Sequence, residues 1–259
     1  MQLSQVINMS THPIQNSEYE QSCKRAFDKA GVLVLKGFLT PPARAAIVNE
    51  GSNKQSCAFY TRSGHNVYLT QKDPSFADDH PRNQWVQSSK GCITDEQIGL
   101  DSPLRTLYDS KELRSFLAFV MGEKKLYPYA DPLSSINLHY ASEGQELGWH
   151  FDNSSFAITL LVQSPKAGGQ FEYVAKLRDA SKGDMNYPGV GLVLNGELEG
   201  LALAIDAGDL VLFRGRDALH RVTPTQGDTT RMLAVLAYNA EADIALSESA
   251  RMTFYGRLK

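Results

Sequence analysis

Two histidines and one aspartate have the types and spacing of metal ligands. His150 and Asp152 lie in the segment Leu147-Gly-Trp-His-Phe-Asp-Asn153, and His220 follows His150 by 70 residues (220 − 150). Alternate side chains of a β-strand share a face, so His150 and Asp152 are expected to point to one side. Two imidazoles and one carboxylate on one face of an octahedron leave three positions open for a bidentate oxo acid and O2, as in non-haem Fe(II) sites.

The metal hypothesis depends on the whole pattern, because an isolated H-x-D triplet is common by chance and a lone histidine is more often a hydrogen-bonded core or surface residue. Arg231 follows His220 by 11 residues (231 − 220) and begins the apolar run 232–237. An arginine that points into a barrel costs free energy unless an anion meets it, and a guanidinium matches a carboxylate in bidentate fashion. The alternative is that Arg231 pairs with Asp209 or Asp228 at a strand edge.

The elements that must position these residues change in type along the chain. Capping patterns and apolar periodicity predict helices from Ser17 to Ala30, where Ser17 and Glu20 make a capping-box pattern, from Thr40-Pro41 to near Gly51, and from Ser102-Pro103 to Gly122. A short strand is predicted at 32–35. Residues 51–100 carry weak signals and are expected to form loops, short strands and a mobile cover of the site. The polar loop 178–188 is a second candidate cover.

After Pro132, short apolar runs alternate with glycine and polar turns. They predict roughly eight strands, at Ser135–Tyr140, Trp149–Asp152, Phe156–Gln163, Gln170–Val174, Gly191–Leu194, Leu201–Ile205, Asp209–Phe213 and Met232–Tyr238. Strands at this spacing favour a mostly β fold of the jelly-roll or barrel type, with the earlier helices covering one face. We expect one domain over residues 1–259, with a helical and loop part at 1–131, a β core at 132–240 and a C-terminal tail at 241–259.

Composition excludes several classes of partner. Hydrophobic residues make up 42% and charged residues 21%, as in ordinary soluble domains, and the net charge of −3 gives no reason to expect nucleic acid. No apolar run reaches about 18 residues and the N-terminus lacks the order of a signal peptide, so no membrane span is expected. Three separated cysteines indicate reduced thiols. We therefore expect a cytoplasmic protein with a small-molecule substrate; the oligomeric state does not follow from the sequence.

Five segments together resemble one enzyme superfamily. These are 137–140 (Asn-Leu-His-Tyr), the segment around His150, 168–173 (Gly-Gly-Gln-Phe-Glu-Tyr), 208–213 (Gly-Asp-Leu-Val-Leu-Phe), and 220–224 (His-Arg-Val-Thr-Pro) through Arg231. They resemble the Fe(II)/2-oxoglutarate-dependent dioxygenase superfamily, from about Pro132 to Tyr238. Within it the chain is most similar to the stand-alone free-amino-acid hydroxylases and radical halogenases.

The resemblance implies a double-stranded β-helix that holds Fe(II) with His150, Asp152 and His220. The co-substrate 2-oxoglutarate would bind iron through its 1-carboxylate and 2-keto oxygens and would place its far carboxylate on Arg231. O2 would be the oxidant, with ascorbate as the reductant in vitro. Members of this superfamily often contact the co-substrate from the strand before the metal motif, so Asn137 and His139, which share a face, are candidates. Their alternatives are a turn or strand-edge hydrogen bond for Asn137 and a buried, hydrogen-bonded imidazole for His139.

The resemblance also bears on the reaction. In the halogenases of this superfamily a small residue replaces the carboxylate and frees a coordination position for chloride. Because Asp152 is present, the sequence predicts hydroxylation with release of succinate and CO2; desaturation and ring closure stay open. Candidate substrate contacts are Arg82 and Lys90, for a substrate carboxylate, and Asn153 and Ser155, which follow the metal motif.

Three rival functions stay open. A demethylase or hydroxylase of a macromolecule should carry a basic groove with aromatic side chains, which the acidic composition disfavours. A non-catalytic barrel could bind a metal or a small acid as a sensor. A structural or interaction protein would use the same histidines in its core and bind no iron.

Overall fold

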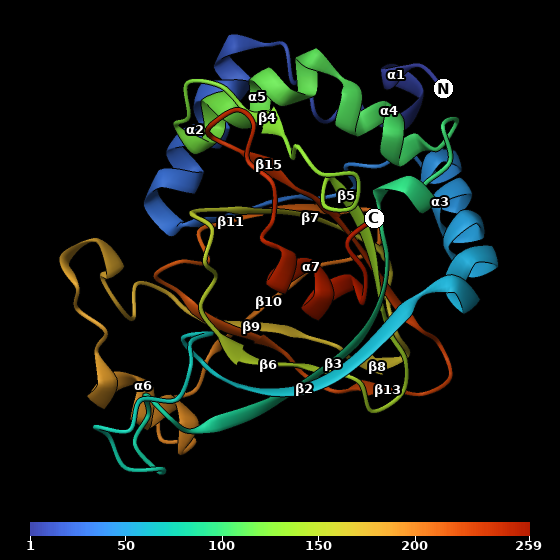
Figure 1. Ribbon diagram of the computed structural model, residues 1–259. Coiled ribbons are helices and arrows are strands. Elements are labelled where there is room, and N and C mark those ends of the chain that lie inside the picture. The colour runs from blue at the N-terminus through green and yellow to red at the C-terminus, as the bar shows by residue number, and fades with distance from the viewer.

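A curled antiparallel sheet of 11 strands organises residues 1–259, all of which the computed structural model describes (Figure 1). Its order is β1 (Val32–Leu35), β11 (Leu210–Phe213), β7 (Ala157–Gln163), β14 (Arg231–Leu236), β5 (Ile136–Ala141), β3 (Trp85–Ile93), β6 (Leu147–His150), β12 (Leu219–Val222), β9 (Phe171–Val174) and β10 (Leu201–Leu203). The strand β2 (Phe59–Asn66) pairs with β3 outside this path. Two small sheets join β13 (Thr225–Gln226) to β8 (Ala167–Gly168) and β15 (Tyr238–Asn239) to β4 (Tyr127–Pro128).

Strand β3 turns this sheet into two facing layers. Gly91 pairs with Tyr140 of β5, whereas Ser88 pairs with Leu147 of β6, so one strand belongs to both layers. Figure 1 shows β7 and β11 in one layer and β6 and β9 in the other. The jelly-roll fold class predicted from the sequence is therefore confirmed.

A layer of helices covers the side of the sheet that contains β1, β11, β7, β14 and β5 (Figure 1). It consists of α1 (Leu3–Val6), α2 (Ser17–Ala30), α3 (Pro41–Lys54), α4 (Pro103–Asp109) and α5 (Lys111–Met121). Their apolar faces share one core of 34 buried residues with this side of the sheet, and this core includes Phe27, Phe116 and Leu160. Its burial is the main driving force that holds the two together. The predicted placement of the helices against one face is confirmed.

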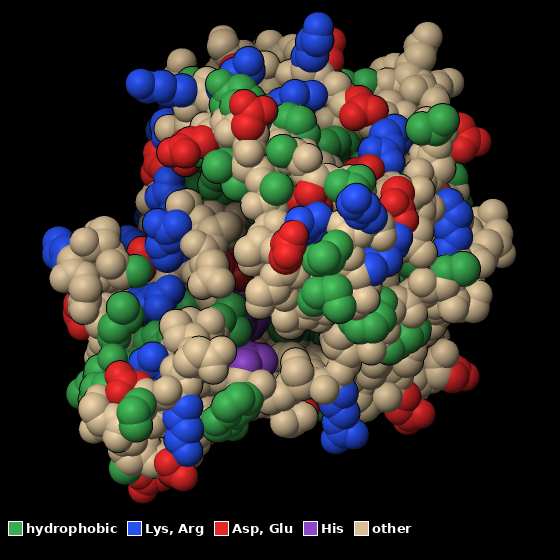
Figure 2. All heavy atoms as spheres, viewed as in Figure 1, with side chains coloured by type: hydrophobic (Ala, Val, Ile, Leu, Met, Phe, Trp, Pro, Cys, Tyr) green, Lys and Arg blue, Asp and Glu red, His purple; other side chains and the backbone are tan.

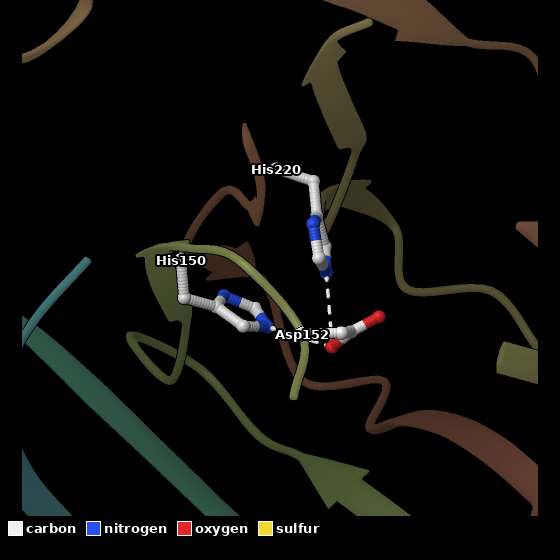
Figure 3. Close-up of side chains that lie close together, drawn as sticks. All are labelled: His150, Asp152 and His220. Carbon is white, nitrogen blue, oxygen red and sulfur yellow. Dashed lines mark ion pairs between the residues drawn. The ribbon is translucent and has the colours of Figure 1, made fainter. Parts of the chain in front are cut away.

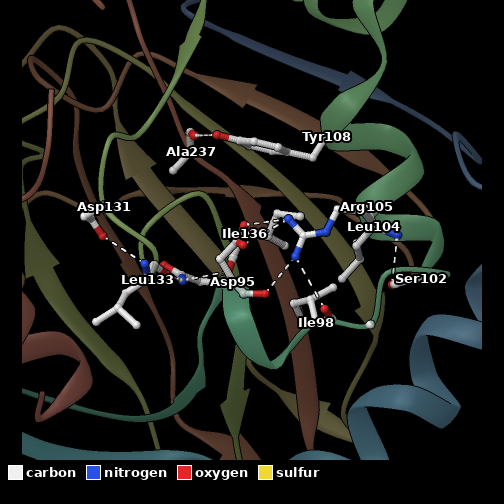
Figure 4. A network of polar contacts seen from close by, with 12 residues as sticks. Asp95, Ile98, Ser102, Leu104, Arg105, Tyr108, Asp131, Leu133, Ile136 and Ala237 are labelled. Atoms are coloured by element: carbon white, nitrogen blue, oxygen red, sulfur yellow. Dashed lines mark hydrogen bonds and ion pairs between the residues drawn. The ribbon is translucent and has the colours of Figure 1, made fainter. Parts of the chain in front are cut away.

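Polar contacts fix the helical layer to the strand ends (Figure 4). Arg105 of α4 donates to both carboxylate oxygens of Asp95, each at 3.0 Å, and to the Asp95 backbone carbonyl at 2.8 Å. The hydroxyl of Tyr108 donates to the carbonyl of Ala237 at 2.7 Å. Asp95 follows β3 and Ala237 follows β14, so α4 is held to two strands whose other face lines the barrel interior.

Four local predictions were wrong. The apolar run 191–194 lies in a helix, α6 (Tyr187–Leu194), because Asn186 caps its start by accepting from the Gly189 amide and Pro188 occupies its first turn. Residues 51–100 contain the long strands β2 and β3 rather than only short ones. Ser110 is extended and splits the third predicted helix into α4 and α5. Asn16, not Ser17, caps α2.

The remaining elements are a C-terminal helix and three short 3-10 turns. The C-terminal helix α7 (Glu248–Tyr255) packs on β2 and β3, and short 3-10 turns occur at Gln55–Cys57, Asp95–Gln97 and Ala180–Lys182. None of the helices has the length and apolar character needed to cross a bilayer.

Candidate metal centre and its cavities

Strand register places the two histidines face to face. His220 of β12 and His150 of β6 are directly opposite in the antiparallel pair, and their ring centroids are 4.1 Å apart. Asp152 lies just beyond the end of β6, where its backbone N–H donates to the carbonyl of Gly215 at 3.0 Å. His220 is itself in strand β12, which is not among the strands predicted from the sequence.

The three side chains direct one ligand atom each toward a common point (Figure 3). Asp152 Oδ1 is 3.8 Å from His150 Nε2 and 3.6 Å from His220 Nε2, and all three ligand atoms lie within 4.8 Å of one another. Both histidines are buried and Asp152 is partly buried. This donor set of two neutral nitrogens and one carboxylate oxygen fits a divalent first-row metal such as Fe(II).

Backbone carbonyls hold both imidazoles in the tautomer that a metal requires. His150 Nδ1 donates to the Gly148 carbonyl at 2.8 Å, and His220 Nδ1 donates to the Ala218 carbonyl at 3.0 Å. A carbonyl only accepts, so the proton sits on Nδ1 and the Nε2 lone pair faces Asp152. Burial, followed by the neighbouring His220, lowers the pKa of His150 to about 3, which keeps this imidazole neutral.

The carboxylate of Asp152 is ionised in this setting. Burial acts to raise its pKa, but His220, His150 and the more distant Lys90 together lower it below the usual value. A methyl group built on Gly215 would lie 1.8 Å from Asp152 Oδ2, so only glycine at position 215 leaves room for this carboxylate. The sequence alone did not single out Gly215, because the contact joins residues 63 positions apart (215 − 152).

Three basic side chains gather on the interior face of β3, β5 and β14. Lys90 Nζ is 3.4 Å from both ring nitrogens of His139, and burial, then Lys90 and Arg231, lower the pKa of His139 well below its usual value. Arg231 is buried, its Nε has no hydrogen-bond partner, and burial lowers its pKa to about 10. The alternative pairings of Arg231 are not made, because Asp209 pairs with Lys36 and Asp228 with Lys166.

The Asn137 side chain connects β5 to α7 through a hydrogen bond. Its amide donates to the carbonyls of Leu133 and Ile136, and its Oδ1 accepts from the Tyr255 hydroxyl at 2.9 Å. These contacts match the structural alternative for Asn137 more closely than a co-substrate contact. Asn137 and His139 both line a cavity of about 160 Å³, together with Lys90, and we call it the lysine cavity.

A second cavity of about 370 Å³ opens beside Asp152, and we call it the arginine cavity. Its lining includes Arg82, Asn153, Arg178 and Arg216, so two of the predicted substrate contacts lie there. Lys90 lies at the lysine cavity instead, and Ser155 is exposed and lines neither cavity. Figure 2 shows histidine side chains at the bottom of a hollow on this face, with Lys and Arg side chains along one side of it.

Both segments expected to cover the site contribute to the arginine cavity. Thr70 and Arg82 come from the segment between β2 and β3, and Arg178 and Met185 come from the loop 178–188. Sequence reasoning missed a third imidazole, His65, whose ring centroid lies 6.2 Å from that of His150 and whose Nε2 is 2.7 Å from Ser88 Oγ. It stands in a polar stretch that gave no strand signal.

Comparisons with known proteins agree with this geometry. The family model described as Halogenase D (HalD) matches residues 15–254. A search of curated protein sequences found no match. The chain is similar in structure to the epimerase SnoN in complex with Fe3+, alpha ketoglutarate and nogalamycin RO, with a TM-score of 0.55 and 11% identity over 86% of this chain and 84% of that one.

Two further solved structures share the fold. A prolyl-4-hydroxylase from Pseudomonas putida has a TM-score of 0.52 and 12% identity, over 84% of this chain and 98% of that one. AviO1 from Streptomyces viridochromogenes Tue57 has a TM-score of 0.55 and 13% identity, over 88% of this chain and 98% of that one. The structural similarity establishes the common fold of Fe(II)/2-oxoglutarate oxygenases, and identities this low leave the substrate open.

Gly215→Ala should weaken metal binding while the protein stays folded. The added methyl group would displace the Asp152 carboxylate, and disturbing the surroundings of a ligand typically costs about 10–100-fold in metal affinity. Titration of the metal-free protein with Fe(II) under anaerobic conditions measures the change. Gly191→Ala in α6, where the nearest atom is Pro81 Cγ at 3.2 Å, is the matched control. Equal iron affinity in the two variants would contradict the proposed contact.

The stability of the metal-free protein should fall as the pH drops below about 6.5, in part through His139. The folded state holds the pKa of His139 well below 6.5, so the unfolded chain binds the proton more readily and the free energy of unfolding decreases with falling pH. In His139→Gln, urea unfolding between pH 6.5 and 5 should show a shallower decrease than in the wild type. His150 contributes equally in both proteins. Parallel curves would show that His139 is not held neutral.

Proposed function

The chain belongs to the Halogenase D family and has the fold of the Fe(II)/2-oxoglutarate oxygenases, and we propose that it hydroxylates an unactivated C–H bond of a small polar substrate such as a free amino acid. The products would be the hydroxylated substrate, succinate and CO2. The observation that carries the proposal is that one barrel contains both a cluster of three metal-ligating side chains and a buried arginine without a counter-ion.

His150, Asp152 and His220 would hold Fe(II), and bound Fe(II) with 2-oxoglutarate would supply the activation of O2. The protein's own part begins with Arg231, whose guanidinium would bind the far carboxylate of 2-oxoglutarate and regain the hydrogen bonds that it lacks. Lys90 adds positive charge on the same interior face, next to His139. A dianionic co-substrate would therefore offset the cost of burying these cations.

Asp152 supports hydroxylation rather than halogenation, despite the name of the family. Its carboxylate takes one of the metal positions, and its negative charge disfavours a halide beside it. Gly215 leaves space for the oxygen Oδ2, so the local backbone is fitted to a carboxylate at this position. Arg82 and Asn153 line the cavity beside Asp152 and are the proposed substrate contacts, and Lys90 lines the lysine cavity.

Purified protein with Fe(II), ascorbate and 2-oxoglutarate should release succinate, and pooled free amino acids should increase the rate. Asp152→Ala should lose at least about 100-fold of this activity, because one of three ligands is removed. Asp228→Ala, which removes a surface partner of Lys166, is the matched control and should keep full activity. In a chloride buffer, mass spectrometry should find a hydroxylated and no chlorinated product. Iron-loaded protein without succinate release would favour the sensor alternative.

Arg231→Gln should raise the Kd for 2-oxoglutarate by at least about 30-fold. Removing one partner of a buried charge pair costs about 2 kcal/mol or more, and 1.4 kcal/mol corresponds to a factor of ten. The protein without ligands should unfold at an equal or higher urea concentration, since the substitution removes an unpaired buried charge. Anaerobic titration calorimetry measures the affinity, with Arg25→Gln on α2 as the control. Unchanged affinity would remove Arg231 from the co-substrate site.

A further inference from the structure

The arginine cavity holds positive charges that the binding of metal and 2-oxoglutarate leaves unmatched. Resting on the proposed oxygenase function, we propose that the substrate carries an acidic side group, either a second carboxylate or a phosphate monoester, and that Arg82, Arg178 and Arg216 together bind this group and the α-carboxylate beside Asp152. An acidic amino acid or a phosphorylated amino acid has this chemistry. The following observations on charge, geometry and size carry the inference.

None of the three arginines that line the cavity forms an ion pair with a carboxylate. Each spends one nitrogen on a backbone carbonyl: Arg82 Nη1 on Gln71 at 3.0 Å, Arg178 Nε on Arg216 at 2.7 Å, and Arg216 Nη2 on Asn153 at 3.1 Å. A guanidinium has five N–H donors, so most of their donors stay free. These contacts fix the side chains in place and leave their donors available to a ligand.

Arg178 is also held by packing, which reduces the entropy that a ligand would have to overcome. Its guanidinium carbon lies 4.1 Å from the centre of the Phe151 ring, and Phe151 is fully buried next to Asp152 in the chain. Asp217 lies near enough to act against the lowering of the pKa of Arg178 that burial causes. Its carboxylate accepts from the Ala180 amide at 2.9 Å and makes no ion pair with Arg178. The charge of Arg178 is therefore positioned beside the metal centre and lacks a partner there.

The cavity offers no site for a cationic side chain. Asp152 is its only lining carboxylate, and this carboxylate belongs to the metal centre. The lysine cavity contains no carboxylate at all and carries Lys90. A basic substrate would bring its ammonium group to like charges without a compensating anion. Neutral oxygen acceptors line the cavity, among them the hydroxyls of Tyr68 and Ser181 and the side-chain amide oxygen of Asn153, and these can receive the α-ammonium group of an acidic amino acid.

The size of the cavity agrees with a small molecule. Its volume of about 370 Å³ lies in the lower part of the usual range for small-ligand sites, roughly 300–1,000 Å³. Planar guanidinium groups match a carboxylate or a phosphate equally well, so the class of acid group has to come from experiment.

The test compares pairs of amino acids that differ in one charge. The anaerobic Fe(II)·2-oxoglutarate protein is titrated calorimetrically with L-glutamate and L-glutamine, L-aspartate and L-asparagine, phosphoserine and serine, and L-lysine. The acidic member of at least one pair should bind about tenfold or more tightly than its neutral partner. A preference for phosphoserine over both dicarboxylates would assign the phosphate class. Equal or tighter binding of the neutral partners or of lysine, or binding of none, would overturn the inference.

Variants then assign the preference to the cavity. Arg82→Gln and Arg178→Gln should each reduce the acidic-over-neutral preference about tenfold or more, and Arg178→Lys should restore part of it, while Arg25→Gln on α2 should leave it unchanged. If Arg178→Gln does not fold, Arg82→Gln carries the test alone. An unchanged preference in Arg82→Gln and in every folded variant at position 178 would contradict the assignment.

Succinate release separates this inference from the function on which it rests. Succinate formed with neutral or basic amino acids, and not with acidic ones, would leave the oxygenase standing and remove the acidic substrate. Absence of 2-oxoglutarate binding and of succinate in every arm would instead remove the oxygenase proposal itself.

Discussion

The pairing of His150 with His220 across β6 and β12 is the constraint on which the site depends. Side chains alternate between faces along a strand, so a slip of one residue would move one imidazole out of the barrel and leave a single nitrogen near Asp152. The register is held from both sides, because β12 also pairs with β9 from Leu219 to Val222. The carbonyls of Gly148 and Ala218, each two residues before its histidine, then orient the rings. Backbone geometry therefore determines where the two imidazoles meet.

The same alternation lets one sheet serve both a core and a charged interior. On β5, Ile136, Leu138 and Tyr140 pack into the core beneath the helices, while Asn137 and His139 face the lysine cavity. On β14, the core residues Met232 and Ala234 follow Arg231, which faces inward. The free energy gained on the helix side can hold unpaired cations in position on the other side before any anion arrives. This preorganisation reduces the rearrangement that binding would require.

Site residues could be predicted from the sequence where they form a recognisable local pattern. The H-x-D spacing, the later histidine and an arginine at the head of an apolar strand are visible in one dimension, and the structure brings His150, Asp152 and His220 together. Only short strands were predicted where the long strands β2 and β3 lie, because polar residues occupy both faces of these strands, as expected for strands between a cavity and solvent. Residues 191–194 form too short an apolar run to distinguish strand from helix by periodicity. Gly215, Arg178 and Arg216 matter through contacts with distant segments, which no local pattern reports.

The close fit of Gly215 to Asp152 also gives the site a direction in evolution. A chain that replaced Asp152 by a small residue would keep a sound backbone and gain an empty space beside Gly215. A chain that first acquired a larger residue at position 215 would lose the room for its carboxylate and, with it, a metal ligand. Loss of the carboxylate thus takes a single substitution, whereas its recovery is blocked once position 215 carries a larger side chain. The order of substitution at these two spatially adjacent positions therefore matters. Loss of the carboxylate ligand is easier for descendants of this chain than its recovery.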